Sequence, residues 1–175
     1  MTKPQVDPPL QPDELVSAAG ERETLETFLD LYRGIVRRKL TGVSEADARQ
    51  RLVPSLTTLV GLVRHLAAVE RGWFQLTLAQ RPPERITGRF RSGDASWQPD
   101  ADETIESILA DYDEACAESR RIAAGLRLDD VAPHNRMGQV SLRWVYVHLI
   151  EETARHAGHA DILRELTDGR TGFDS

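Results

Sequence analysis

Histidine and glutamate residues gather on one face of a single predicted helix near the end of the chain. The run HLIEETARHAGH contains three of the five histidines, His148, His156 and His159, together with Glu152. At about 100° per residue, with His148 set at zero, Glu152 falls near about 40°, His156 near about 80° and His159 near about 20°. These four polar side chains therefore share one narrow face of the helix.

A fourth histidine, His65, belongs to a predicted helix in the middle of the chain, in GLVRHLAAVERGWF. It lies three residues after Leu62 and four before Val69, which places it on the inward face. His65 is about 15 Å from the start of its predicted helix and about 21 Å from the other end. Glu152 and His156 lie about 16 Å and about 22 Å from the start of theirs. His65 therefore lies at the same height in the bundle as Glu152 if the two helices are parallel, and as His156 if they are antiparallel.

Imidazole nitrogen and carboxylate oxygen are ligands for zinc, nickel, iron or manganese. Side chains at positions i and i+4 of one helix can bind the same ion, as Glu152 and His156 are spaced to do. Three protein ligands leave a coordination position for water or substrate. The alternatives are a core His65 hydrogen-bonded to a neighbour, a surface network of histidines around Glu152, and a purely structural bundle.

The elements that would position these residues are long helices with an inward apolar stripe. Helical spacing of apolar residues, with caps, predicts long helices over 21–40, 55–79, 102–124 and 141–167, and a short turn of helix over 44–52. Residues 80–101 lack this pattern and could cross the whole height of a bundle, since they span about 70 Å when extended. We expect an all-α four-helix bundle over 19–175, without strands, after an extended or disordered arm at 1–18.

Composition narrows the class of protein. The chain has 175 residues, 40% hydrophobic and 29% charged, with no signal-like start and no apolar run that could span a membrane, so we expect a cytoplasmic single domain. A net charge of -6 argues against nucleic acid as a partner. The single cysteine, Cys116, is expected to be a packed helical thiol. Trp97 is a candidate lid over a pocket, Trp73 and Trp144 are expected in the core, and His134 in a loop.

The two histidine segments, GLVRHLAAVERGWF and RWVYVHLIEETARHAGHADILRELTDG, resemble the DinB-like superfamily, above all a bacterial branch with the RHAGHAD signature. PSLTTLVGLVRHL and FLDLYRGIVRRKLTGVSEADARQRL are similar to the same branch, and the resemblance covers about residues 20 to 169. It implies a four-helix bundle with up-down-down-up connectivity, in agreement with the crossover between the second and third helices. It also implies a divalent metal held by His65, Glu152 and His156.

Many members of the superfamily have histidine where this chain has Glu152, and those that resemble mycothiol-dependent isomerases have glutamate, so the resemblance favours zinc but leaves nickel, iron or manganese open. His148 and His159 are additional; they would line the cavity, orient ligands, replace one, or shuttle protons. The resemblance implies an enzyme that activates a low-molecular-weight thiol, such as mycothiol as co-substrate, or water, for transfer to or hydrolysis of a small molecule. The alternative is a non-catalytic, metal-stabilised, stress-related binding protein. The family also allows a homodimer.

Overall fold

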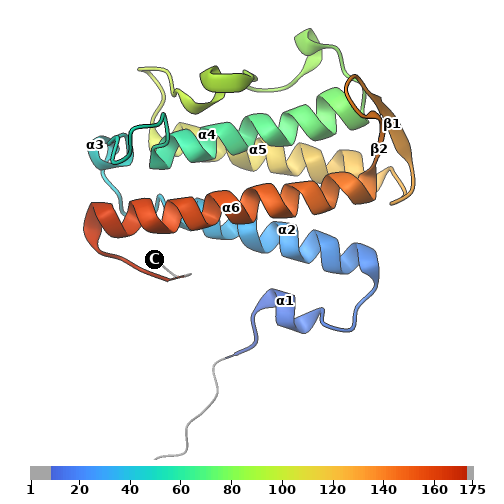
Figure 1. Cartoon of the computed structure of the whole chain (residues 1–175), viewed down its shortest axis with the longest axis horizontal. Coiled ribbons are helices and arrows are strands. Elements are labelled where there is room, and N and C mark those ends of the chain that lie inside the picture. Colours follow the sequence, from blue (N-terminus) through green and yellow to red (C-terminus); the bar gives the residue numbers. More distant parts are fainter. Residues whose placement is uncertain (1–8, 173–175) are drawn as a thin grey trace, which may run out of the picture.

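The computed structural model describes residues 9–172, and four long helical segments in it lie side by side (Figure 1). The chain is mostly helical, with one small antiparallel sheet of two strands. Helix α2 contacts α6, and α4 contacts both α5 and α6. Along the chain the elements are α1 (Pro12–Leu15), α2 (Glu21–Arg38), α3 (Glu45–Ala48), α4 (Leu59–Glu70), η1 (Arg71–Leu78), η2 (Pro83–Arg85), η3 (Gly93–Trp97), α5 (Ile105–Ala124), β1 (Val131–His134), β2 (Gly138–Ser141) and α6 (Leu142–Asp168).

Two clusters of buried apolar side chains fill the space between the helices, one at each end of the molecule. The first includes Val36, Leu62 and Leu66 with residues of α5, and the second includes Leu29 and Leu149. The long helices form where the apolar periodicity indicates them because each buries its apolar stripe in these clusters. None of the helices in the part of the chain described is both long and apolar enough to cross a membrane.

The helix starts differ from the sequence-based expectation where hydroxyl groups compete for the cap. Ser55 was expected to begin the second long helix, but its hydroxyl contacts the Thr57 hydroxyl at 2.8 Å, and α4 instead begins after Thr58, whose side chain accepts from the Gly61 backbone N–H. Helix α5 begins three residues later than expected, with Thr104 as its cap. Helix α6 begins after Ser141, as expected.

Two irregular features were not expected. The second long helix becomes a π-helix over η1, where backbone bonds reach back five residues, as from Ala79 N–H to the Phe74 carbonyl. The loop at 126–140 contains the β1–β2 hairpin, so the expectation of no strands is wrong. Each strand has only four residues, which is too short for an alternating pattern to be recognised. Gly138, with φ 75°, supplies the left-handed backbone that the turn requires.

The expected arm at 1–18 lies partly outside the described residues, which begin at residue 9. The described part is not wholly extended, because it contains the short helix α1, which contacts α2. Val16, just after α1, is buried.

Two arginines tie the bundle together from inside. Arg33 on α2 donates to both oxygens of Glu70 at the end of α4, at 2.8 and 2.6 Å, and both side chains are buried. Arg71 on η1 donates to both oxygens of Asp111 on α5, at 2.8 and 2.7 Å. Paired donors of this kind suit the planar guanidinium, and they fix how the helices lie against each other around the site.

Candidate metal centre

Three side chains that are far apart in the sequence converge between α4 and α6. The structure brings together His65 from α4 with Glu152 and His156 from α6, and one ligand atom of each lies within 4.8 Å of the others. Glu152 Oε1 is 3.4 Å from His65 Nε2 and 3.2 Å from His156 Nε2. His156 is only 6% exposed, and the other two are half-buried. Within residues 9–172, no other group of three potential ligands meets this spacing.

The two distances to Glu152 suit a small divalent cation. Zinc binds imidazole nitrogen and carboxylate oxygen at about 2.0–2.2 Å, so two ligands of a tetrahedral site lie about 3.4 Å apart. The distances from Glu152 Oε1 to the two Nε2 atoms are close to this value. Hydrogen bonds from His156 and then His65 hold the pKa of Glu152 well below its ordinary value, so this carboxyl group is an anion. Nitrogen and oxygen donors with one negative charge fit a divalent metal.

The hydrogen-bond network behind His65 fixes which ring nitrogen faces the centre. The Ser96 hydroxyl donates its one hydrogen to the Gly93 carbonyl oxygen at 2.6 Å, and the same oxygen is 2.8 Å from His65 Nδ1. His65 Nδ1 must therefore carry a hydrogen and donate to Ser96. Nε2 then donates to the Glu152 carboxylate only when the ring is a cation, and in the neutral ring it presents a lone pair toward that carboxylate. Two acceptors that face each other call for a cation between them, which a metal ion or a proton supplies.

Trp97 covers His65. Its ring stacks on the imidazole with centroids 4.0 Å apart and an angle of 12° between the planes. This close approach of η3 to α4 depends on Gly61, because a Cβ there would lie 2.6 Å from the Trp97 carbonyl oxygen. Trp97 therefore contacts a candidate ligand directly and packs against the first apolar cluster, but it does not line the cavity beside His65, so its role as a lid over a pocket stays a prediction.

The two additional histidines of α6 have different surroundings. His159 Nδ1 is 3.3 Å from His156 Nδ1, behind the ring that contacts Glu152. Loss of water around the ring lowers the pKa of His159, and the nearby His156 and Arg155 lower it further. His159 can therefore orient His156, as hydrogen-bonded neighbours orient metal ligands in other proteins.

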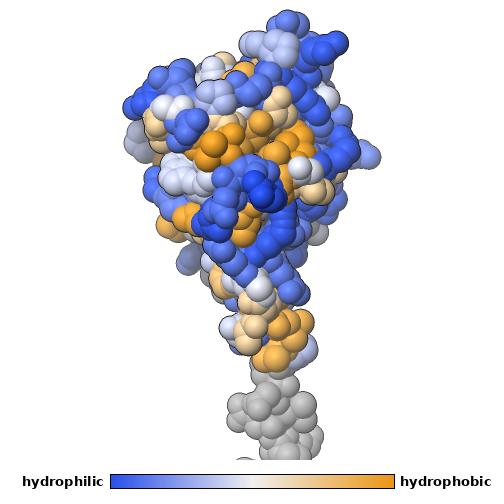
Figure 2. Space-filling model, turned by 90° about the vertical axis from the view of Figure 1, so that its right-hand side faces the viewer, coloured by the Kyte–Doolittle hydropathy of each residue, from blue (hydrophilic) through white to orange (hydrophobic). Residues whose placement is uncertain are grey.

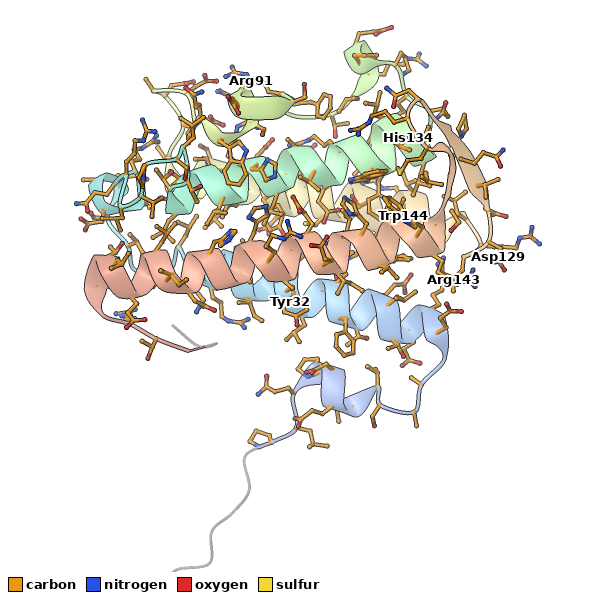
Figure 3. All side chains as sticks on the ribbon, viewed as in Figure 1. Tyr32, Arg91, Asp129, His134, Arg143 and Trp144 are labelled. Carbon is orange, nitrogen blue, oxygen red and sulfur yellow. The ribbon has the colours of Figure 1, made fainter. Side chains whose placement is uncertain are left out.

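His148 instead belongs to a second aromatic cluster at the hairpin end of the bundle. Its ring stacks on Trp144, with centroids 5.0 Å apart, and meets Trp73 edge-on at 4.9 Å. His134 stacks on Trp73 at 5.4 Å, and Figure 3 shows His134 and Trp144 at the same end of the molecule. The expectation of a buried Trp144 is wrong, because 39% of it is exposed. His134 lies on strand β1 and not in a loop.

Cys116 is buried on α5, as expected of a packed helical thiol. Burial raises the pKa of the thiol, and the negative charge of Glu70 raises it further, so Cys116 is neither anionic nor accessible at neutral pH. Sequence reasoning missed Ser96, which lies in the crossover between α4 and α5, because no helical or strand period places a loop hydroxyl beside a histidine.

Comparison with known proteins agrees with the earlier resemblance. The family model described as mycothiol-S-transferase matches residues 24–169, which is most of the chain and includes all three converging residues. This family lies within the DinB-like superfamily. No curated protein matches the chain. From a match of this extent, over a chain that brings His65, Glu152 and His156 together, we conclude that the protein belongs to the mycothiol-S-transferase family.

Proposed function

We propose that the protein is a metal-dependent thiol S-transferase that uses mycothiol, or a related low-molecular-weight thiol, as co-substrate. His65, Glu152 and His156 are its proposed metal ligands, and zinc is the favoured metal. The observation that carries the proposal is the meeting of one ligand atom from each of His65, Glu152 and His156 within 4.8 Å, in a chain of the mycothiol-S-transferase family.

A divalent cation at this position would lower the pKa of a bound thiol and favour its anionic, nucleophilic form. In the transfer, a bond forms between the thiol sulfur and a carbon of the electrophile. The bond from that carbon to its leaving group breaks, and the leaving group keeps the electron pair. The thiol proton must leave as well, so a base near the centre is needed.

Among the proposed proton carriers, His159 is better placed than His148. His159 contacts His156 directly, and its lowered pKa favours the neutral, proton-accepting ring at neutral pH. His148 is occupied by stacking on Trp144. Ser96 keeps His65 Nε2 turned toward Glu152, and Trp97 shields that ring from water. The role of these side chains is to hold the site in a fixed, partly dry geometry.

The domain bounds and the connectivity of the helices belong to the same proposal. We infer a single bundle domain over 19–175 with up-down-down-up connectivity. Support comes from the colour order in Figure 1, where α4 and α5 run in one direction and α2 and α6 in the other. A cytoplasmic location and a homodimer also remain proposals, and we expect a small-molecule substrate.

Metal analysis of the purified protein tests the ligand assignment. His65→Ala and Glu152→Ala should each remove most of the bound ion, whereas Glu151→Ala, a matched control at the adjacent, exposed carboxylate, should retain it. Metal content that survives both ligand substitutions would refute the assignment.

Assays with mycothiol and a panel of electrophiles test the reaction. If the metal-loaded protein gives no turnover with any thiol and no hydrolysis, but loses thermal stability when the metal is removed, the non-catalytic binding role is correct instead. The ligands bridge α4 and α6, so an ion there stabilises the fold in either case.

A further inference from the structure

A cavity of about 310 Å³ opens beside His65, which is the one candidate ligand in its lining. Its inner end is formed by His65 and Ser96, and its other end by Trp73 and His134. The cavity therefore leads from a proposed metal ligand to the second aromatic cluster. Its volume is near the lower limit for pockets that hold small molecules.

A second cavity, of about 390 Å³, continues the groove past Trp73. Both cavities are lined by Trp73 and His134, and the second adds Asn135, Arg136, Met137 and Trp144. Figure 2 views this end of the bundle and shows apolar residues exposed on it, with polar residues between them. Trp144, Met137 and Val131 are exposed large hydrophobic residues there. Trp73 lines both cavities, so a ligand that extends from the His65 end of the first cavity toward the second contacts this ring.

The lining of the first cavity is apolar and nearly uncharged. Val69, Leu76 and Phe90 accompany Trp73, and Arg91 is the one Arg, Lys, Asp or Glu side chain in the lining. Both terminal nitrogens of Arg91 are engaged by Asp100, at 2.9 and 2.8 Å, so its charge is already balanced. Such a lining disfavours anions and highly polar groups and favours flat apolar ones.

The Trp73 ring is held firmly for a partly exposed side chain. His134 stacks against it with 13° between the planes, while Trp144 and His148 contact it at centroid distances of 5.1 and 4.9 Å. The π-helix beneath is pinned by a hydrogen bond from the Thr77 hydroxyl to the Gly72 carbonyl, at 2.9 Å. A ring fixed in advance loses little freedom when a second aromatic group packs on it.

We propose that this groove binds the electrophilic substrate, and that the substrate carries a flat, uncharged aromatic group that packs on Trp73 while its reactive carbon lies at the His65 end. This inference rests on the proposed thiol transfer, but it concerns the second reactant and not the thiol. It gives His134 and His148 a role apart from metal binding: they hold the aromatic ring on which the substrate packs.

The test uses the full, zinc-loaded chain with mycothiol and two electrophiles. One is aromatic, 1-chloro-2,4-dinitrobenzene, whose reaction joins sulfur to the ring and releases chloride and a proton; the other is iodoacetamide, small and aliphatic. Trp73→Leu should raise KM for the aromatic electrophile about tenfold and leave KM for iodoacetamide within about twofold. Trp73→Phe, which keeps a flat ring, should recover most of the loss. An unchanged KM for the aromatic electrophile in Trp73→Leu would overturn the proposal.

A binding measurement separates this inference from the proposed function. Calorimetric titration with 1,3-dinitrobenzene, which lacks the leaving group, should show binding that Trp73→Leu weakens by a similar factor. If Trp73→Leu weakens binding but no electrophile turns over, thiol transfer is refuted, while binding of an aromatic group in the groove is supported. If turnover occurs and neither KM nor binding depends on Trp73, the proposed binding of the electrophile in the groove is refuted, while thiol transfer is supported. His134→Ala, which removes the opposing ring from the hairpin, gives the same test should Trp73→Leu fail to fold.

Discussion

Replacement of Ser96 by alanine should weaken zinc binding although Ser96 is not a proposed ligand. The Ser96 hydroxyl accepts from His65 Nδ1 at 2.8 Å and is itself fixed by the Gly93 carbonyl at 2.6 Å. Ser96 is only 2% exposed, so water cannot readily replace it. Without the hydroxyl, the His65 N–H loses its partner, and the ring is free to rotate or to carry its hydrogen on Nε2, where it blocks the metal.

The expected size follows from these contacts. An unpaired buried donor costs about 1–3 kcal/mol, and each 1.4 kcal/mol is about a factor of ten in affinity. Loss of a group that orients a ligand lowers metal affinity about 10- to 100-fold in comparable sites. We therefore expect Ser96→Ala to bind zinc about 10- to 100-fold more weakly.

Competition with a chromophoric chelator at fixed pH measures this affinity. Ser92→Ala is the matched control, since Ser92 lies in the same loop, is exposed and makes no side-chain cap bond. Nitrogen-15 NMR of the metal-free protein should also show the hydrogen on His65 Nδ1 in the native chain and a mixture of tautomers in Ser96→Ala. Zinc affinity equal to that of the native chain, in a folded Ser96→Ala variant, would show that the tautomer argument is wrong.

Four further substitutions, in three experiments, test the structure that supports the site. Glu70→Leu removes the buried carboxylate that pairs with Arg33 and leaves this arginine the more exposed Asp30, so it should cost about 3–5 kcal/mol in urea unfolding, whereas adding Arg33→Met should recover most of that loss; equal costs for the single and double variants would contradict this. Gly61→Ala should cost about 1–3 kcal/mol by thermal unfolding and reduce the shielding of His65 by Trp97, because the new Cβ meets the Trp97 carbonyl; an unchanged melting temperature would argue against that close contact. Burial alone would raise the pKa of Asp30, but hydrogen bonds from Arg120 and Arg33 lower it by more, so the net pKa lies below its ordinary value. Its ion pairs should stabilise the fold above the unfolded-state pKa and lose that effect as pH falls through the lower folded value, so the deficit of Asp30→Asn at neutral pH should vanish in acid unfolding curves.

The long helices and the convergence of the three candidate ligands could be predicted because both depend on regular geometry. His65 precedes the π-helix, and α4 is a regular α-helix from Leu59 to Glu70, so the inward face worked out from the sequence holds at His65. The distance counted from Ser55 does not hold, because α4 begins after Thr58. Glu152 and His156 lie one turn apart on an unbroken helix, α6. Periodicity therefore placed these side chains even though the start of α4 was wrong by a few residues.

The features that were missed depend on contacts between distant segments. Helix η1 has only 8 residues, too few for the spacing of its apolar side chains to distinguish a π-helix from an α-helix. The hairpin buries only Ala132 and Val140, one residue in each strand, so its sequence carries almost no alternation. Ser96 reaches His65 only because residues 80–101 fold back over α4, and local sequence does not specify that return path.

The attachment of η3 to His65 has an evolutionary consequence. Connections between bundle helices ordinarily tolerate insertions and deletions, because little depends on their length. Here Ser96 and Trp97 both contact a candidate ligand, so a residue gained or lost between 93 and 97 would displace the support of the site itself. Length differences among relatives should therefore concentrate in the earlier part of the crossover, around 80–86, and the later part should keep a constant spacing to α5.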